Sequence, residues 1–194
     1  MEADKLIRIA ITAPDIRHDE NDVITSLANN GWHMIHLRHP AASLREMRNL
    51  IESIPQQFHH KLRLHGHFEL INEFNLGGLH LNSRCPLAPP LYTGPVSRSC
   101  HSIAEIADCT DCDYVTLSPV FDSISKSGYK ATFTPSDLRE LDRISHPAVI
   151  AMGGITPQRV KELKRFNFAG YAVLGAIMLR DDYNDAILQF NDIN

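Results

Sequence analysis

Eight short apolar segments recur along this chain of 194 residues, and nearly every one ends in a polar residue or a glycine. Most are followed by a stretch with helical character, which gives a series of eight strand-then-helix units. Such a series predicts an α/β fold, a small (β/α)8 TIM barrel, in a single domain over residues 1–194. The segments are KLIRIAIT, HMIHLR, KLRLHG, GGLHL, PVSRS, DYVTLS, PAVIAMG and AGYAVLG.

Turn and cap residues set the expected bounds of these units. Helices are expected to start at Ser102-x-x-Glu105, a capping box, and at Thr134-Pro135 and Thr156-Pro157, where proline takes the first helical position. The proline-rich stretch 83–94 predicts a loop in place of one outer helix. The expected strands are 5–12, 33–38, 61–66, 77–82, 95–99, 113–118, 147–153 and 169–175, and the other helices are about 20–30, 42–54 (capped by Ser43), a very short one ending near 75, and 182–191.

Composition excludes several classes of partner. The net charge of −4 argues against nucleic acid and against an acidic membrane surface. No apolar run approaches the ~20 residues of a membrane span, and the charged N-terminus does not resemble a secretory signal. A cytoplasmic protein is expected, and a homo-oligomer stays open.

The four cysteines are expected to be thiols. Cys109-x-x-Cys112 has the spacing of zinc ligands but should lie at the amino-terminal face of the barrel, with Cys85 and Cys100 at the opposite face. Four ligands cannot converge across a barrel, so incidental thiols are expected and no metal ligands are assigned.

Alternation along the strands separates two faces. Apolar side chains such as Leu37, Leu64 and Leu79 should pack against the helices, while polar side chains should point into the barrel. The carboxyl-terminal mouth tolerates such groups best, because ligand and water can satisfy them there. The predicted constellation is His36, Arg38, His65, His80, Ser99 and Ser118. The alternative is that some of these groups only satisfy one another.

Glycines at the ends of the last two strands indicate an anion site. Gly153-Gly154 and Leu174-Gly175 fall where such barrels bind phosphate, and glycine lets backbone N–H groups approach an anion. Tight turns are the alternative. Arg38 ends an apolar strand, where its permanent positive charge is unfavourable unless it meets an anion, so contact with an anionic ligand is expected. The alternative is a salt bridge to a neighbouring carboxylate. Lys126, among Ser123 and Ser125, suits a loop that closes over phosphate or pyrophosphate, or else is a solvated surface residue.

Taken in order, these stretches resemble the family of thiamine-phosphate synthases and the related thiazole tautomerases (the TenI-like proteins). The resemblance covers nearly the whole chain and is most specific in its last two blocks. The matching blocks are His36-Leu37-Arg38, Gly78-Leu79-His80-Leu81, Ser99-Cys100-His101-Ser102 with Glu105, Asp113-Tyr114-Val115 through Ser118-Pro119-Val120-Phe121 to Ser123-x-Ser125-Lys126, and Ala151-Met152-Gly153-Gly154-Ile155-Thr156-Pro157.

The resemblance implies a small phosphorylated thiazole as partner, and pyrophosphate if the protein is a synthase. Arg38 and Lys126 would then hold pyrophosphate with Ser99 in contact, and Gly154, Leu174 and Gly175 would hold the thiazole phosphate. The candidate catalytic residues are His36, Arg38, His65, Ser99 and Lys126, and the candidate substrate-binding residues are His80, His101, Ser118, Ser123, Ser125, Gly153, Gly154, Leu174 and Gly175.

Three departures from the synthases bear on the reaction. The synthases have a magnesium-binding aspartate after strand 3, and Gly66 stands at that position here. Their second magnesium-binding aspartate falls in the stretch 82–85, which has no carboxylate in this chain. A lysine that follows strand 2 in the synthases is replaced by Pro40. Without these carboxylates the pyrophosphate leaving group loses its metal.

The tautomerases need no metal, so a tautomerase-like isomerase without a cofactor is expected. Their catalytic histidine follows strand 6, where Pro119 stands here, so proton transfer falls to His36, His65 or His101, with His36 or His65 preferred and Arg38 as carboxylate clamp. The alternatives are a Mg²⁺-dependent synthase and a non-catalytic paralogue that binds thiazole phosphate.

Overall fold

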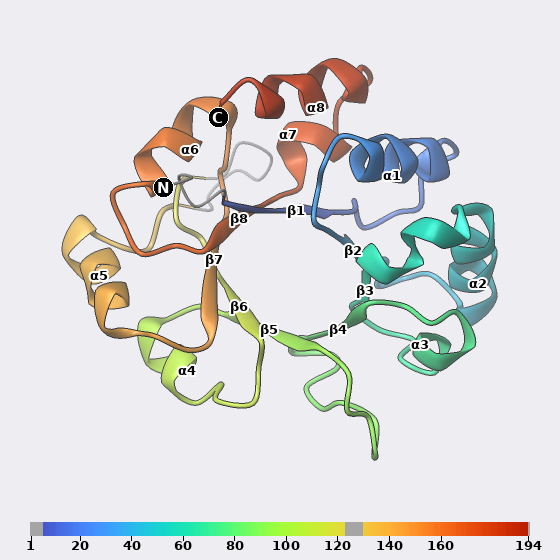
Figure 1. The fold of residues 1–194 in the computed structure, drawn as a ribbon, viewed down its shortest axis with the longest axis horizontal. Coiled ribbons are helices and arrows are strands. Elements are labelled where there is room, and N and C mark those ends of the chain that lie inside the picture. The colour runs from blue at the N-terminus through green and yellow to red at the C-terminus, as the bar shows by residue number, and fades with distance from the viewer. Residues whose placement is uncertain (1–5, 123–129, 194) are drawn as a thin grey trace.

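The computed structural model describes residues 6–122 and 130–193, and in it eight parallel strands form one closed barrel in chain order (Figure 1). Each strand pairs with its sequence neighbours, and β1 closes the barrel against β8. The predicted (β/α)8 fold is confirmed. The strands are Ile7–Ile11 (β1), Met34–Leu37 (β2), Leu62–Leu64 (β3), Gly78–Leu81 (β4), Val96–Cys100 (β5), Tyr114–Leu117 (β6), Ala148–Met152 (β7) and Gly170–Val173 (β8).

Helices surround the barrel, and several are short (Figure 1). None of those in the described part of the chain is long and apolar enough to cross a membrane. The α-helices are Glu20–Asn29 (α1), Leu44–Ser53 (α2), Leu70–Glu73 (α3), Ile103–Ala107 (α4), Pro135–Arg139 (α5), Pro157–Leu163 (α6), Gly175–Met178 (α7) and Tyr183–Asn191 (α8), and the 3-10 helices are Gln56–Lys61 (η1) and Glu140–Arg143 (η2).

The predicted caps explain where the helices begin. The Ser43 and Thr134 side chains each accept from the N3 backbone and complete capping boxes. The Ser102 and Thr156 side chains also accept from the N3 backbone and cap α4 and α6, but neither completes a capping box: Glu105 accepts from the backbone N–H of His101 instead of that of Ser102. Segment 83–94 contains no helix, as its prolines predict. Two features were not expected: η1 precedes β3, and β8 ends at Val173 because Gly175 already begins α7.

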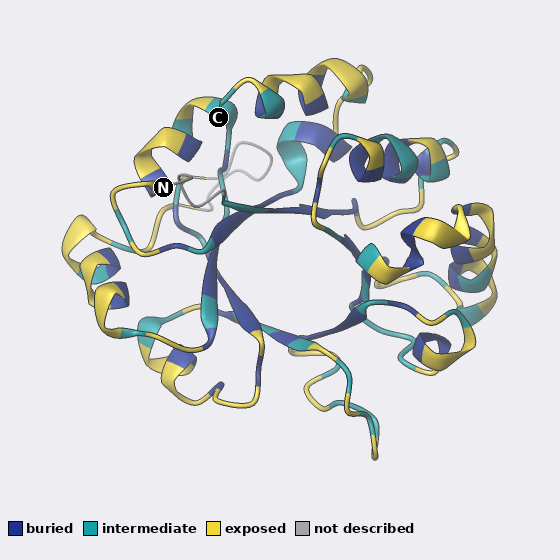
Figure 2. Cartoon of the chain, in the orientation of Figure 1, coloured by how far each residue is buried: buried dark blue, intermediate teal, exposed yellow. Residues whose placement is uncertain are grey.

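The strands of the barrel are mostly buried (Figure 2), and their two faces bury different kinds of side chain. The outward parity packs against the helices in one large core, as the alternation predicts; its members include Ile35, Leu37, Leu62, Leu64, Leu79, Val115 and Leu117. A smaller cluster of Ile9, Ile11, Tyr114, Ile150 and Ala172 groups the inward side chains of β1, β7 and β8 with Tyr114 of β6. The polar inward side chains described below come from β2 to β6. The interior is therefore apolar on one side and polar on the other.

The position expected for Cys100 is wrong. Alternation turns Ser99 inward, so Cys100 points to the helix layer, where its Sγ lies 3.7 Å from that of Cys109 and both thiols are buried. Burial raises the pKa of the Cys100 thiol, and the neighbouring Cys109 raises it further. Burial also raises the pKa of Cys112. All four cysteines are free thiols. Cys100, Cys109 and Cys112 therefore pack as apolar groups on the outer side of the barrel.

Candidate active site at the barrel mouth

A cavity of about 580 Å³ opens at the carboxyl ends of the strands. Among the residues that line it are six of those predicted from the sequence: Arg38, His65, His80, Ser99, His101 and Ser118. We refer to it as the mouth cavity. His36, also predicted, lies beneath it with no exposed surface. The structure therefore brings the predicted residues together around one cavity, with His36 buried beneath it and not exposed to it.

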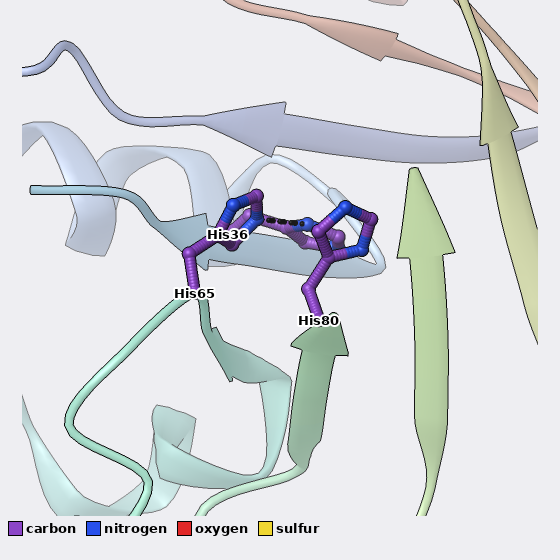
Figure 3. A group of neighbouring side chains, drawn as sticks. All are labelled: His36, His65 and His80. Carbon is purple, nitrogen blue, oxygen red and sulfur yellow. Dashed lines mark hydrogen bonds between the residues drawn. The ribbon is translucent and has the colours of Figure 1, made fainter. Parts of the chain in front are cut away.

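Three histidines from neighbouring strands form a compact group (Figure 3), in which His65 and His80 line the cavity and His36 lies beneath it. His36 Nδ1 lies 2.9 Å from His65 Nε2, and the rings of His65 and His80 stack with centroids 4.2 Å apart. His36 Nε2 lies 2.7 Å from the Tyr114 hydroxyl. His80 bonds Ser97 through Nδ1 and Ser99 through Nε2, both at 2.8 Å. The alternative, that the inward polar side chains only hydrogen-bond to one another, thus holds for His36 with His65 and for His80 with Ser99.

Burial keeps all three imidazoles neutral. It lowers the pKa of His36 well below 6.5, and repulsion from His80 when protonated and from Arg63 lowers that pKa further. Burial likewise lowers the pKa of His65 well below 6.5, with contributions from His80 and His36. Burial and the nearby Arg98 lower the pKa of His80 to about 3. At neutral pH these rings act as neutral donors and acceptors.

The low pKa of His80 predicts acid sensitivity. Between pH 6.5 and about 3 the unfolded chain binds a proton at this residue and the folded chain does not. This contribution to stability is therefore complete above pH 6.5 and is lost as the pH falls, at up to about 1.4 kcal/mol per pH unit. Urea unfolding of the wild type and of His80→Gln between pH 7 and 4 measures it. Parallel pH curves for the two proteins would contradict the expectation, since the carboxylates contribute equally to both.

Arg38 presents an unsatisfied cation to the mouth cavity. Within the described part of the chain its guanidinium makes no hydrogen bond or ion pair, which disfavours the salt-bridge alternative. Burial lowers the pKa of Arg38, and the positive charge of Arg84, which lines the same cavity, lowers it further. A half-buried arginine without an acidic partner favours binding of an anionic ligand.

Carboxylates are scarce around this cavity. Among the described residues that line it, Glu105 is the one acidic group. Its two oxygens accept from the His101 backbone N–H and from the Ser102 hydroxyl. Gly66 has no side chain to offer, and the Asn82 side-chain oxygen accepts from the backbone of Arg84 and Cys85. These residues do not fit the carboxylate site that Mg²⁺ requires in the synthases.

The residues of the two predicted glycine turns are not among those that line the mouth cavity, although Met152, directly before Gly153, is. Gly153 and Gly154 follow β7 with φ of +95° and +63°, and Leu174 and Gly175 follow β8, which pairs with β7. A Cβ at Gly154 would lie 2.2 Å from the Asp122 carbonyl oxygen. All four residues are partly exposed at the ends of adjacent strands, which is where an anion could reach their backbone N–H groups.

His101 has a defined tautomer and a free ring nitrogen. Its Nδ1 lies 3.1 Å from the Ser118 carbonyl oxygen, which can only accept, so Nδ1 carries the hydrogen. In the neutral ring Nε2 then carries a lone pair, and this atom bonds no other residue in the described ranges. The side chain lines the mouth cavity beside Ser118, directly before Pro119.

Sequence reasoning missed two parts of this site. His39 Nε2 pairs with Glu20 Oε1 at 2.7 Å, both side chains are fully buried, and the Thr12 hydroxyl lies 3.1 Å from the same nitrogen. No sequence pattern links Glu20 of α1 to a residue after β2. Tyr114 has the inward parity of Thr116, and this parity is the signal that could have found it. Ser123, Ser125 and Lys126 lie outside the described residues.

A family model described as thiamine monophosphate synthase matches residues 8–177. The chain belongs to this family. The thiamine-phosphate synthase of Salinibacter ruber is 29% identical over 124 residues, which are 60% of this chain and 54% of that protein. The thiamine-phosphate synthase of Latilactobacillus sakei is 24% identical over 148 residues, 72% of this chain and 66% of that protein. The matches thus span less than two thirds of these relatives.

Solved structures agree with this family assignment. Thiamine phosphate pyrophosphorylase from Bacteroides thetaiotaomicron superposes with a TM-score of 0.83 and 34% identity, over 97% of this chain and 95% of that one. The enzyme of the same name from Pyrococcus furiosus has a TM-score of 0.79 at 20% identity and covers 98% of this chain and 96% of that one, so it supports the fold alone.

Proposed function

We propose that this member of the thiamine-phosphate synthase family binds a phosphorylated thiazole carboxylate and isomerises it by proton transfer. The observation that carries the proposal is the lining of the mouth cavity: it joins an unpaired arginine and several imidazoles, and its one described carboxylate is occupied by backbone and hydroxyl donors. Such a lining suits an anionic ligand and proton transfer better than the metal-assisted loss of pyrophosphate.

Each part of the ligand has a matching group. The N–H groups at Gly154 and Gly175 would hold the phosphate, and the Arg38 guanidinium would hold the carboxylate. Isomerisation removes a proton from one ligand atom and returns a proton to another, so composition does not change and one acid–base group suffices. His101 is our choice for that group, because its free Nε2 can accept the proton and return it.

This choice revises the preference among three predicted histidines. His36 has no exposed surface and both its ring nitrogens are hydrogen-bonded. His65 lines the cavity, yet burial lowers its pKa well below 6.5, which makes it a weak base at neutral pH. In the tautomerases the catalytic histidine follows strand 6, and His101 contacts Ser118 at that place.

The alternative is a thiamine-phosphate synthase, which the names of the relatives favour. One pair of assays separates the two functions. The chelator-treated protein is incubated with thiazole carboxylate phosphate in D2O, and isomer formation and deuterium incorporation are followed by NMR. It is then given a hydroxymethylpyrimidine diphosphate, thiazole phosphate and Mg²⁺.

Isomerisation without metal is the expected result. Mg²⁺-dependent formation of thiamine phosphate at an enzyme-like rate would overturn the proposal in favour of the synthase. Tight binding of the thiazole phosphate by calorimetry, with neither reaction, would overturn it in favour of a non-catalytic binding protein.

A further inference from the structure

We propose that His36, His65 and His80 form a site for one divalent transition-metal ion, such as Zn²⁺ or Co²⁺, at the floor of the mouth cavity (Figure 3). Each histidine offers one ring nitrogen, and the three ligand atoms lie within 4.8 Å of one another. They come from the ends of β2, β3 and β4, so rigid neighbouring strands hold them. This is a site of different chemistry from the carboxylate site of the synthases.

The surrounding hydrogen bonds orient the nitrogens as metal ligands require. The Tyr114 hydroxyl engages His36 Nε2, which turns His36 Nδ1 toward His65 Nε2. The Ser97 hydroxyl donates to the Leu79 carbonyl oxygen, so Ser97 accepts from His80 Nδ1–H and the lone pair of His80 lies on Nε2. Metal-binding histidines characteristically use their second nitrogen in this way.

The spacing suits a tetrahedral ion. Zinc–nitrogen bonds of about 2.0–2.1 Å place ligand nitrogens roughly 3.3 Å apart. His36 Nδ1 and His65 Nε2 are already 2.9 Å apart, and His80 Nε2 needs only to exchange its bond with the Ser99 hydroxyl. His65 and His80 line the mouth cavity, so the fourth position faces its interior. Three neutral imidazoles favour zinc, cobalt and similar ions over Mg²⁺, which prefers oxygen ligands.

This inference goes beyond the proposed function and does not rest on it. The proposed isomerisation assigns proton transfer to His101, which is not one of the three ligands. Metal binding is measured on the protein alone, without any thiazole, so a failure of either proposal leaves the other standing.

The test is titration of the chelator-treated full chain with Co²⁺, followed by visible absorption, and with Zn²⁺, followed by calorimetry. One ion per chain is expected, with the intense visible bands of tetrahedral Co²⁺. His65→Gln and His80→Gln should each weaken Co²⁺ binding at least a hundredfold. Tyr114→Phe removes the hydroxyl that contacts His36, Ser97 and Arg63 while leaving all three ligands in place, and should weaken binding about ten- to a hundredfold.

His67→Gln is the matched control, because His67 also lines the mouth cavity while its Nε2 contacts the Ala42 carbonyl oxygen outside the cluster. It should bind Co²⁺ like the wild type. Circular dichroism identifies variants that fail to fold, and because His65 reaches the surface its replacement tests the site even if His80→Gln unfolds. The proposal is overturned if the wild type binds no Co²⁺, if His65→Gln binds it equally well, or if near-ultraviolet bands show thiolate ligands from the cysteines.

Discussion

Gly154→Ala is expected to weaken binding of thiazole phosphate about ten- to a hundredfold, through the loss of one charge-assisted hydrogen bond of about 1.5–3 kcal/mol. Gly154 has a φ of +63°, and an added Cβ would meet the Asp122 carbonyl oxygen at 2.2 Å and Arg159 Nη1 at 2.8 Å. The turn after β7 must therefore shift, and its N–H groups turn away from the phosphate. Calorimetry with thiazole phosphate and with the unphosphorylated thiazole alcohol measures the effect.

The comparison of the two ligands isolates the phosphate. The variant should bind the alcohol as the wild type does, so the preference for the phosphate should shrink. Gly66→Ala is the control for the same chemical change, because its Cβ would meet only Cys85 Sγ, at 3.8 Å. If Gly154→Ala folds and keeps the full preference for the phosphorylated ligand, the phosphate binds elsewhere and this turn is only a tight connection.

Much of the fold could be predicted because its determinants are local. The alternation in β2, β4 and β6 assigns Leu37, Leu79 and Val115 to the outer core, where the structure places them. Ser43 and Thr134 mark helix starts because their caps involve residues only three positions away. The position of Cys100 was predictable by the same rule, and the error came from placing it by the strand end at which it lies and not by the direction of its side chain.

The residues of the site could be predicted from the sequence, but the contacts between them could not. Parity sends His36, His65 and His80 inward, but parity alone does not reveal that one ring lies beneath the others. The contacts of Tyr114 with His36 and of Glu20 with His39 join strands and helices 78 and 19 residues apart in sequence, and they depend on barrel closure. No periodicity in the sequence encodes such contacts. The chemical division between buried neutral imidazoles and the exposed His101 follows only from burial.

His101→Gln is expected to lower the rate of isomerisation about a hundred- to ten-thousandfold while binding of the thiazole phosphate stays within about threefold. The amide can still contact Ser118 but cannot take up and return a proton. Because the side chain is exposed, the fold should be unaffected. His67→Gln makes the same change at another histidine of the mouth cavity and should keep the wild-type rate.

Chemical rescue distinguishes proton transfer from a structural role. In His101→Ala, added imidazole should restore part of the rate, and the restored rate should depend on the concentration of neutral imidazole. Replacing a purely structural contact would not produce this dependence. If His101→Gln keeps its rate and His65→Gln loses it, the acid–base group is His65, and the ring that burial holds neutral is then the one that moves the proton.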